Sequence, residues 1–278
     1  MSMDNTGIKN YYLKKEEFDL LPFIDSRAYI ESSISRFEGW KSSFDTSHPD
    51  WKKRIEVQRE LADCFEESLY SESSYFMNKD QIKIIFLGAS LGSISTYFFL
   101  NKLKKVGLLN KTKIYIYDLL LEPLKRTIAG DFELSERAER DCGFSESFSS
   151  QEYKRILKNA TIIPGSITDI TNKLGLFDIT VAPYVHHHLN IYDKKLASEK
   201  MAEITASNGL IMLGDLHFDY NSFNLWLDSH KYEFEDVKGT YAIESFIDIN
   251  THIKLFKESL LIHKKQKSFY YVFGLRRE

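Results

Sequence analysis

The feature that most constrains the fold is an alternation of short apolar segments with helical ones from residue 81 to the carboxyl end. Runs rich in β-branched and aromatic residues predict five strands, at residues 82–87, 113–117, 160–163, 177–182 and 209–214. Segments in which apolar residues recur at helical spacing follow most of them. Strands and helices that alternate in this way form βαβ units, and therefore a parallel sheet.

The carboxyl end departs from that alternation. ESLLIHKKQKSFYYVFGLRR, residues 258–277, predicts two strands joined by a tight polar turn at 264–267. Such a hairpin adds an antiparallel pair to a parallel sheet. The sequence therefore predicts an α/β fold: a Rossmann-like, seven-stranded, mostly parallel sheet with an antiparallel C-terminal hairpin.

The first eighty residues show no strand-like alternation. Helical spacing predicts helices at 14–21, 26–37 and 49–75. We interpret residues 1–80 as an N-terminal helical cap or oligomerisation segment, possible in a homodimer, and residues 81–278 as the Rossmann-like domain. Within that domain, the acidic, Ser-rich stretch at 129–150 predicts a solvated or mobile insertion.

Composition excludes several classes of partner. Charged residues make up 28% of the chain with a net charge of only −3, which favours neither nucleic acid nor an acidic membrane surface. No apolar run reaches the roughly 18 residues of a membrane span, and the amino terminus lacks the apolar stretch of a secretory signal. The two cysteines, Cys64 and Cys142, indicate no disulfide framework. We therefore expect a cytoplasmic protein.

The first strand runs into a glycine-containing turn, Gly88-Ala89-Ser90-Leu91-Gly92. Gly88 can take the positive φ of a sharp turn, Gly92 permits close approach of the next helix, and the amides of the turn face an anion. The three-glycine dinucleotide fingerprint is not met. The turn therefore favours a nucleotide-type cofactor but is also compatible with a plain strand-to-helix connection.

Asp118 closes the second strand, 30 residues after Gly88. The carboxyl ends of adjacent parallel strands share one edge, so this carboxylate is expected beside the glycine turn, where it can accept both hydroxyls of a ribose. A strand-ending aspartate is also a common helix cap. Together, the turn and the acid favour a ribose-bearing cofactor.

A third segment, FDITVAPYVHHHLN at 177–190, resembles the fourth motif of class I S-adenosylmethionine-dependent methyltransferases. The resemblance covers residues 81–275 in family order: glycine turn, acid, GSITD after the third strand, the His-His pair, NGLIMLGD at the fifth and the closing hairpin. Three positions depart from the family pattern: Phe86 replaces an acidic residue, Ser90 the middle glycine, and Ser166 an aspartate for which Asp169 can substitute.

The resemblance implies S-adenosylmethionine as cofactor and assigns its contacts. The turn with Gly88, Ala89, Ser90 and Gly92 would hold the methionine end, and Asp118 the ribose. The adenine would lie against Leu119, Ser166 and Ile167, and the sulfonium would be bordered by Ala182 and Pro183.

The resemblance also implies a catalytic group. His187 and His188 match the family's His-His pair, and Asp215 is similar to the acid that accompanies such histidines. An imidazole here can remove a proton from the acceptor, although a histidine at this position also packs or caps a helix in many relatives. Adjacent histidines on one short segment rarely converge on a metal ion, so no metal is expected. The acceptor would contact Tyr11, Tyr12, Tyr184, His186 and His217.

The sequence thus predicts an enzyme that transfers a methyl group to oxygen or nitrogen of a small molecule in a cytoplasmic biosynthetic pathway. Two alternatives stay open. The altered glycine turn is compatible with a methyltransferase-fold protein that has no transferase activity, cyclase-like or regulatory. The strand-turn-helix start is compatible with a nucleotide-binding dehydrogenase, although the closing hairpin disfavours it.

Overall fold

The computed structural model describes residues 13–25, 27, 28, 30, 31, 34, 51–88, 93–134, 136–142, 148–229 and 245–278. Its α-helices are α1 (Lys15–Leu20), α3 (Trp51–Ser71), α4 (Ser73–Met77), α5 (Ile94–Lys105), α6 (Leu121–Ala129), α7 (Glu136–Cys142), α9 (Ser150–Lys158), α10 (Ile191–Ile204), α11 (Tyr220–Ser229) and α13 (Ile249–Lys254). Short 3₁₀ helices are η1 (Leu21–Phe23), η2 (Leu109–Lys111), η3 (Asn172–Leu174) and η4 (His186–His188). The strands are β1 (Ile82–Leu87), β2 (Thr112–Asp118), β3 (Thr161–Pro164), β4 (Phe177–Pro183), β5 (Thr205–Leu216), β6 (Ser259–Gln266) and β7 (Tyr270–Arg277).

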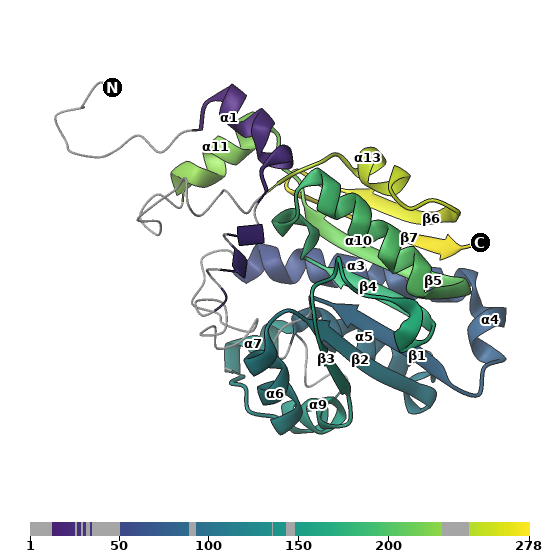
Figure 1. Ribbon diagram of the computed structural model, residues 1–278. Coiled ribbons are helices and arrows are strands. Elements are labelled where there is room, and N and C mark those ends of the chain that lie inside the picture. Colours follow the sequence, from purple (N-terminus) through teal and green to yellow (C-terminus); the bar gives the residue numbers. More distant parts are fainter. Residues whose placement is uncertain are drawn as a thin grey trace.

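These seven strands form one sheet in the order β3-β2-β1-β4-β5-β7-β6 (Figure 1). The first five are parallel, and β7 runs antiparallel to both β5 and β6. The sheet thus confirms the predicted seven-stranded Rossmann-like fold with an antiparallel C-terminal hairpin. The strand order reverses between β1 and β4, and in such sheets ligands bind outside the carboxyl ends of the strands at this point.

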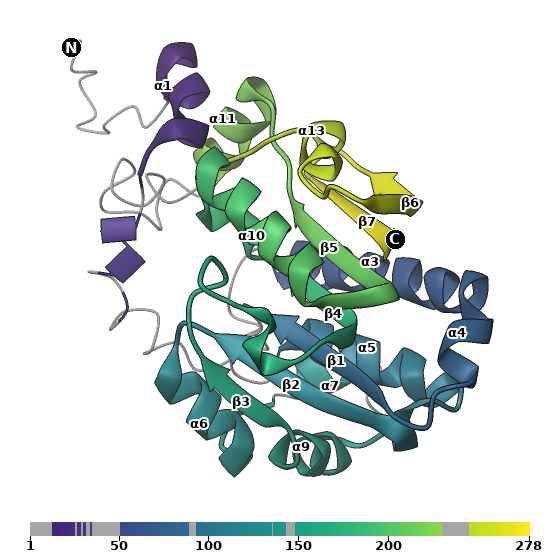
Figure 2. The same ribbon diagram turned by 45° about the vertical axis from the view of Figure 1, so that its right-hand side comes forward.

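Two apolar cores cover the two faces of the sheet. Alternate residues of each strand point to opposite faces, so Ile84 and Phe86 pack on one side with α3 and α5, while Ile85 and Leu87 pack on the other with α10 and α13. Figure 2 shows the sheet between these layers. Parallel strands buried on both faces read as continuous apolar runs, which is why β1 was predicted at its observed bounds.

The described part of the N-terminal region lies in two places. The long helix α3 packs on the sheet beside α5. By contrast, α1 and η1 join α11 in a third apolar cluster that includes Leu13, Leu21 and Phe223. The helix expected at 26–37 lies largely outside the described residues, and the division of the chain at residue 80 stays a prediction.

The prediction of a solvated insertion at 129–150 holds for only part of its described residues, because four of their side chains are buried. The side chains of Phe132, Ala138, Cys142 and Phe148 are buried in the same core as α3 and α5. The charged residues between them form α7, and Trp51 Nε1 donates a hydrogen bond to Asp141 Oδ2 at 3.1 Å. Four widely spaced apolar side chains therefore anchor a segment whose average composition is polar.

The hairpin turn also differs from its predicted position. β6 continues to Gln266, so the turn lies at 267–269 rather than 264–267. Lys264 and Lys265 are exposed residues of β6, which is the last strand of the sheet. Charged side chains are common on such edge strands because they block pairing with other chains. In the sequence, these lysines have the polar character of a turn, which is why the turn was expected at their position.

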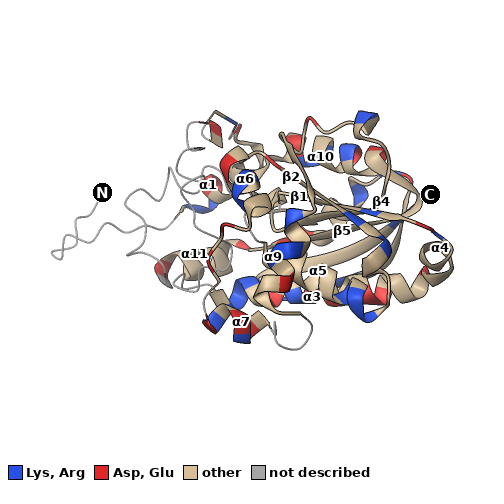
Figure 3. Cartoon of the chain, turned by 90° about the horizontal axis from the view of Figure 1, so that it is seen from below, with Lys and Arg blue, Asp and Glu red and all other residues tan. Residues whose placement is uncertain are grey.

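Charges are dispersed over the helices. Figure 3 shows positive and negative residues interspersed on α3 and α7 rather than separated by sign. Across the residues that the structure describes, no helix is both long and apolar enough to cross a membrane.

Candidate functional site

The carboxyl ends of β1, β2, β4 and β5 bring the predicted site residues to one edge of the sheet. Leu87 pairs with Tyr117, which places Gly88 and Asp118 side by side just beyond that pair. Pro183 pairs with Gly214, which places Tyr184 beside Asp215. The strand register therefore collects residues from four distant parts of the chain.

Gly88 begins the turn after β1 with a φ of 66°. Its amide donates to the carbonyl of Tyr117 at 2.8 Å. A Cβ at this position would lie 2.5 Å from Cγ2 of Val185, closer than real Cβ contacts allow. Both the backbone conformation and the close approach of the segment after β4 thus require glycine here.

Asp118 is buried at the end of β2. Burial raises the pKa of Asp118 to about 6, although backbone amides that donate to the carboxylate, including Leu120 N at 2.9 Å, act in the opposite direction. The contact with Leu120 shows that Asp118 does help to order the entry to α6, as the helix-cap alternative suggested. A buried carboxylate gains from further donors, so this one also suits the hydroxyls of a ribose.

The segment after β3 is attached to the end of β2. Gly165 N donates to Asp118 O at 2.9 Å, and the Tyr117 hydroxyl donates to Ser166 O at 3.0 Å. Ser166 is partly exposed and Ile167 is buried. Leu119 is exposed directly after Asp118. The three residues predicted to contact an adenine therefore lie on the two segments that these hydrogen bonds join.

The end of β4 has a strained turn. Ala182 and Pro183 are buried strand residues, and Tyr184 follows with a φ of 58°. A positive φ is costly for a tyrosine and is found mostly where the surroundings enforce it. Here the amide of Tyr184 donates to Gly214 O at 2.7 Å, and its ring meets that of His187 edge to face, with centroids 4.9 Å apart.

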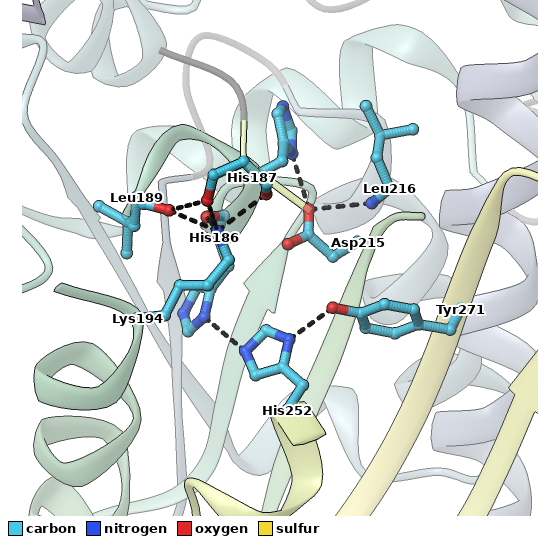
Figure 4. Close-up of polar contacts among 9 residues, drawn as sticks. His186, His187, Leu189, Lys194, Asp215, Leu216, His252 and Tyr271 are labelled. Carbon is cyan, nitrogen blue, oxygen red and sulfur yellow. Dashed lines mark hydrogen bonds and ion pairs between the residues drawn. The ribbon is translucent and has the colours of Figure 1, made fainter. Parts of the chain in front are cut away.

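His187 and Asp215 form a buried pair. His187 Nδ1 lies 2.6 Å from Asp215 Oδ1, which also accepts from Leu216 N at 3.0 Å (Figure 4). Burial alone would raise the pKa of Asp215, but the adjacent imidazole holds it below its usual value. An ionised carboxylate only accepts, so the shared hydrogen belongs to His187 Nδ1. A ring held in this way can take a proton at Nε2 whenever that nitrogen is unprotonated.

His186 points to the opposite side of η4 (Figure 4). Its Nδ1 lies 2.9 Å from His252 Nε2, and His252 Nδ1 lies 2.6 Å from the Tyr271 hydroxyl. Burial lowers the pKa of His186 to about 3 and that of His252 well below its usual value. Both rings are thus neutral. His186 therefore belongs to an internal network rather than to the predicted acceptor contacts.

The other two predicted histidines lie close by. The ring of His188 is partly exposed and its centroid is 4.0 Å from that of His187. His217 is partly exposed beyond β5, where its amide donates to Phe269 O at 2.9 Å. Neither position assigns a role, so the roles of both stay predictions.

Several predicted contacts lie outside the described residues, namely Tyr11, Tyr12, Ala89, Ser90 and Gly92. Among the residues that are described, no three or more His, Cys, Asp and Glu side chains group as a metal site. Three residues were missed by sequence reasoning: Lys194, Ser245 and His252. All three contact the η4 turn or its histidines.

Comparison with solved structures decides the fold family. Magnesium protoporphyrin IX methyltransferase (ChlM) from Synechocystis PCC 6803 with bound SAH matches 91% of this chain and 100% of its own, with a TM-score of 0.54 at 11% identity. The same enzyme with bound SAM matches 92% and 98%, with a TM-score of 0.50 at 9% identity. The chain has the class I methyltransferase fold. The N-methyltransferase NodS from Bradyrhizobium japonicum WM9 also matches, over 88% of this chain and 97% of its own, with a TM-score of 0.48 at 14% identity.

Comparison of the sequence with known families and proteins finds no match. No protein-family model matches the chain, and neither does any curated protein. At identities of 9% and 11%, the likeness to ChlM establishes a common fold alone.

Proposed function

We propose that this protein is an S-adenosylmethionine-dependent methyltransferase that modifies oxygen or nitrogen of a small molecule, in a biosynthetic pathway. The observation that carries the proposal is the shared edge of the sheet, where a required glycine, a buried acid and the His187–Asp215 pair lie at the ends of adjacent strands. The cofactors bound to ChlM support the choice of ligand.

The described residues fit the cofactor in two respects. Gly88 turns the chain sharply at the end of β1 with a positive φ, and Asp118 has an acceptor-only carboxylate whose ionised form is disfavoured by burial. Two ribose hydroxyls would supply donors to that carboxylate. Leu119, Ser166 and Ile167 would then contact the adenine, and Ala182 and Pro183 would border the sulfonium.

When bound, the sulfonium supplies a methyl group for an in-line displacement by the acceptor. The protein has to align the reactants and exclude water. His187 Nε2 would receive the proton of the acceptor O–H or N–H as the new bond to carbon forms. Asp215 would hold the His187 ring in place and stabilise its imidazolium, as the acid of a catalytic triad does.

Calorimetry with S-adenosylhomocysteine tests the cofactor assignment. We expect one site per chain, and an affinity at least about tenfold weaker in Asp118→Ala, because hydrogen bonds to a charged group are worth about 1.5–3 kcal/mol. Asp131→Ala removes an exposed carboxylate just after α6 and should bind like the unmodified protein. Absent binding, or equal affinity in Asp118→Ala, would contradict the proposal.

The same affinity should depend on pH. The pKa of Asp118 is raised to about 6, and the ribose hydroxyls need its ionised form, so protonation competes with binding. The dissociation constant for S-adenosylhomocysteine is therefore expected to rise about tenfold between pH 7 and pH 5. Asp118→Asn keeps an acceptor for Leu120 N but cannot ionise, and should bind weakly with no such dependence. A constant affinity of the unmodified protein over this range would contradict the assignment.

The remaining features of the proposal come from the sequence alone. A cytoplasmic location, a homodimer and the absence of nucleic-acid partners stay predictions, as does the role of Tyr11 and Tyr12 over the acceptor.

A further inference from the structure

Lys194 is a buried lysine whose ammonium faces the η4 turn. It lies in the first turns of α10 and none of its surface is exposed. Lysine is rarely buried completely, because taking an ammonium out of water is costly unless other groups replace its hydration. The position of Lys194 therefore requires a compensating set of acceptors.

Four oxygens provide that set (Figure 4). Lys194 Nζ donates to His186 O at 2.6 Å and to Leu189 O, the two carbonyls that flank the middle of the turn. It also lies 2.9 Å from Ser245 O and 2.6 Å from Ser245 Oγ. An ammonium has three hydrogens, so the four oxygens share them. One charge thus joins both ends of the turn to a residue 51 positions away in sequence.

Ser245 contacts the same turn from a second direction. Its amide donates to His187 O at 2.6 Å, and its hydroxyl donates to Leu189 O. The carbonyls of residues 186, 187 and 189 are therefore all held by Lys194 or Ser245. With these carbonyls fixed, the direction of the His187 side chain is restricted to the rotamers of that single residue.

The outcome is a short contact between His187 Nδ1 and Asp215 Oδ1, at 2.6 Å. We propose that Lys194 is a positioning residue, whose buried ammonium ties residues 186–189 to Ser245 and thereby holds His187 against Asp215. The catalytic consequence rests on the proposed function of His187 as base. The geometric consequence does not, because it concerns a contact within the free protein.

Proton NMR tests this geometry without cofactor or acceptor. On the full chain with ¹⁵N-labelled histidine rings, His187 Nδ1–H should give a downfield resonance that is lost in His187→Gln. Lys194→Met keeps the length of the side chain but cannot donate. In this variant we expect the Nδ1 proton to exchange with water at least about tenfold faster, because losing a hydrogen bond to a charged group typically shifts the equilibrium between the bonded and the open arrangement by that factor. Lys194→Gln, which retains two donors, should recover part of the protection.

Two further variants complete the test. Lys195→Met changes the exposed neighbour on the same helix and should leave the resonance unaltered. Ser245→Ala removes only the hydroxyl, so we expect a smaller increase in the exchange rate of the His187 Nδ1 proton. This variant replaces Lys194→Met in the test if Lys194→Met does not fold. Unchanged frequency and exchange in folded Lys194→Met, or in Ser245→Ala where only that variant folds, would overturn the inference. A failure of the proposed function would instead appear as absent S-adenosylhomocysteine binding, with this result intact.

Discussion

His187→Gln is expected to lower kcat for methyl transfer by about 10²- to 10⁴-fold, the range that a positioned general base contributes. Glutamine fills similar space and can donate to Asp215, but it has no nitrogen that accepts a proton at neutral pH. The affinity for S-adenosylhomocysteine should stay within about threefold, because Asp118 lies on another strand, β2. The measurement is transfer of label from S-adenosylmethionine to an acceptor found by screening phenols, alcohols and amines.

His188→Gln is the matched comparison. His188 is adjacent in sequence and its ring contacts that of His187, but the 2.6 Å contact with Asp215 is made by His187. We expect a loss of less than about tenfold from this variant, the effect of a displaced neighbour rather than of a lost base. A larger loss in His188→Gln than in His187→Gln would show that the base has been assigned to the wrong ring.

Asp215→Asn separates orientation from proton transfer. The amide can present either its oxygen or its NH₂ to His187, so the ring is no longer held in one tautomer. Because the two residues act as one unit, the double variant should cost scarcely more than either single change. Independent, additive losses would show that Asp215 does not act through His187.

The strand pattern explains why the edge of the sheet was predictable. Gly88 directly follows a strand that the sequence outlines, and Asp118 and Asp215 lie at or next to the last residue of two others. The carboxyl ends of parallel strands meet at one edge. Their proximity then follows from topology rather than from side-chain detail. The same topology brings residues 165–167 to the end of β2, where Gly165 N donates to Asp118 O and the Tyr117 hydroxyl donates to Ser166 O.

The different positions of the three histidines were not predictable. Residues 186–188 form a 3₁₀ turn, in which successive side chains diverge by about 120°. His186 and His187 therefore enter separate networks, one with His252 and one with Asp215. Neither the turn type nor the partners, 28 and 66 residues away, can be read from HHH alone.

Lys194 did leave a sequence signal. It lies three and seven residues before Ala197 and Met201, on the same apolar stripe of α10. A lysine in line with buried residues indicates an ammonium that needs acceptors. Its acceptor Ser245 lies after the segment 230–244, and no local pattern connects the two.

The His186–His252 pair predicts marked acid sensitivity of folding. Both rings are neutral in the folded protein because burial and the nearby ammonium of Lys194 disfavour a further positive charge, although Asp215 partly offsets this at His186. The unfolded chain binds protons at these histidines below about pH 6.5, whereas the folded one does not. The contribution of these two rings to the free energy of unfolding is thus fully present above pH 6.5. It is lost as the pH falls below that value, by about 1.4 kcal/mol per pH unit for each ring.

Asp118 acts in the opposite direction. Its pKa is raised to about 6 in the folded protein, so acidification from there towards its ordinary value near 3.8 favours the folded state by up to about 3 kcal/mol. The free energy of unfolding therefore contains a contribution that falls on acidification, from the histidine pair, and one that rises, from Asp118. The contribution of the histidine pair has to be measured as a difference between variants that share Asp118.

His252→Gln supplies that difference. Glutamine can still hydrogen bond to Tyr271 and His186 but does not titrate, so it removes one of the two proton sites. Urea unfolding at pH 7.5, 6.0 and 5.0 should show that, below about pH 6.5, the free energy of unfolding of the unmodified protein falls more steeply than that of the variant, by about 1.4 kcal/mol per pH unit. Equal slopes would mean that His252 binds a proton as readily in the folded protein as in the unfolded chain. The network from His186 to Tyr271 would then have to be open to solvent, which its burial opposes.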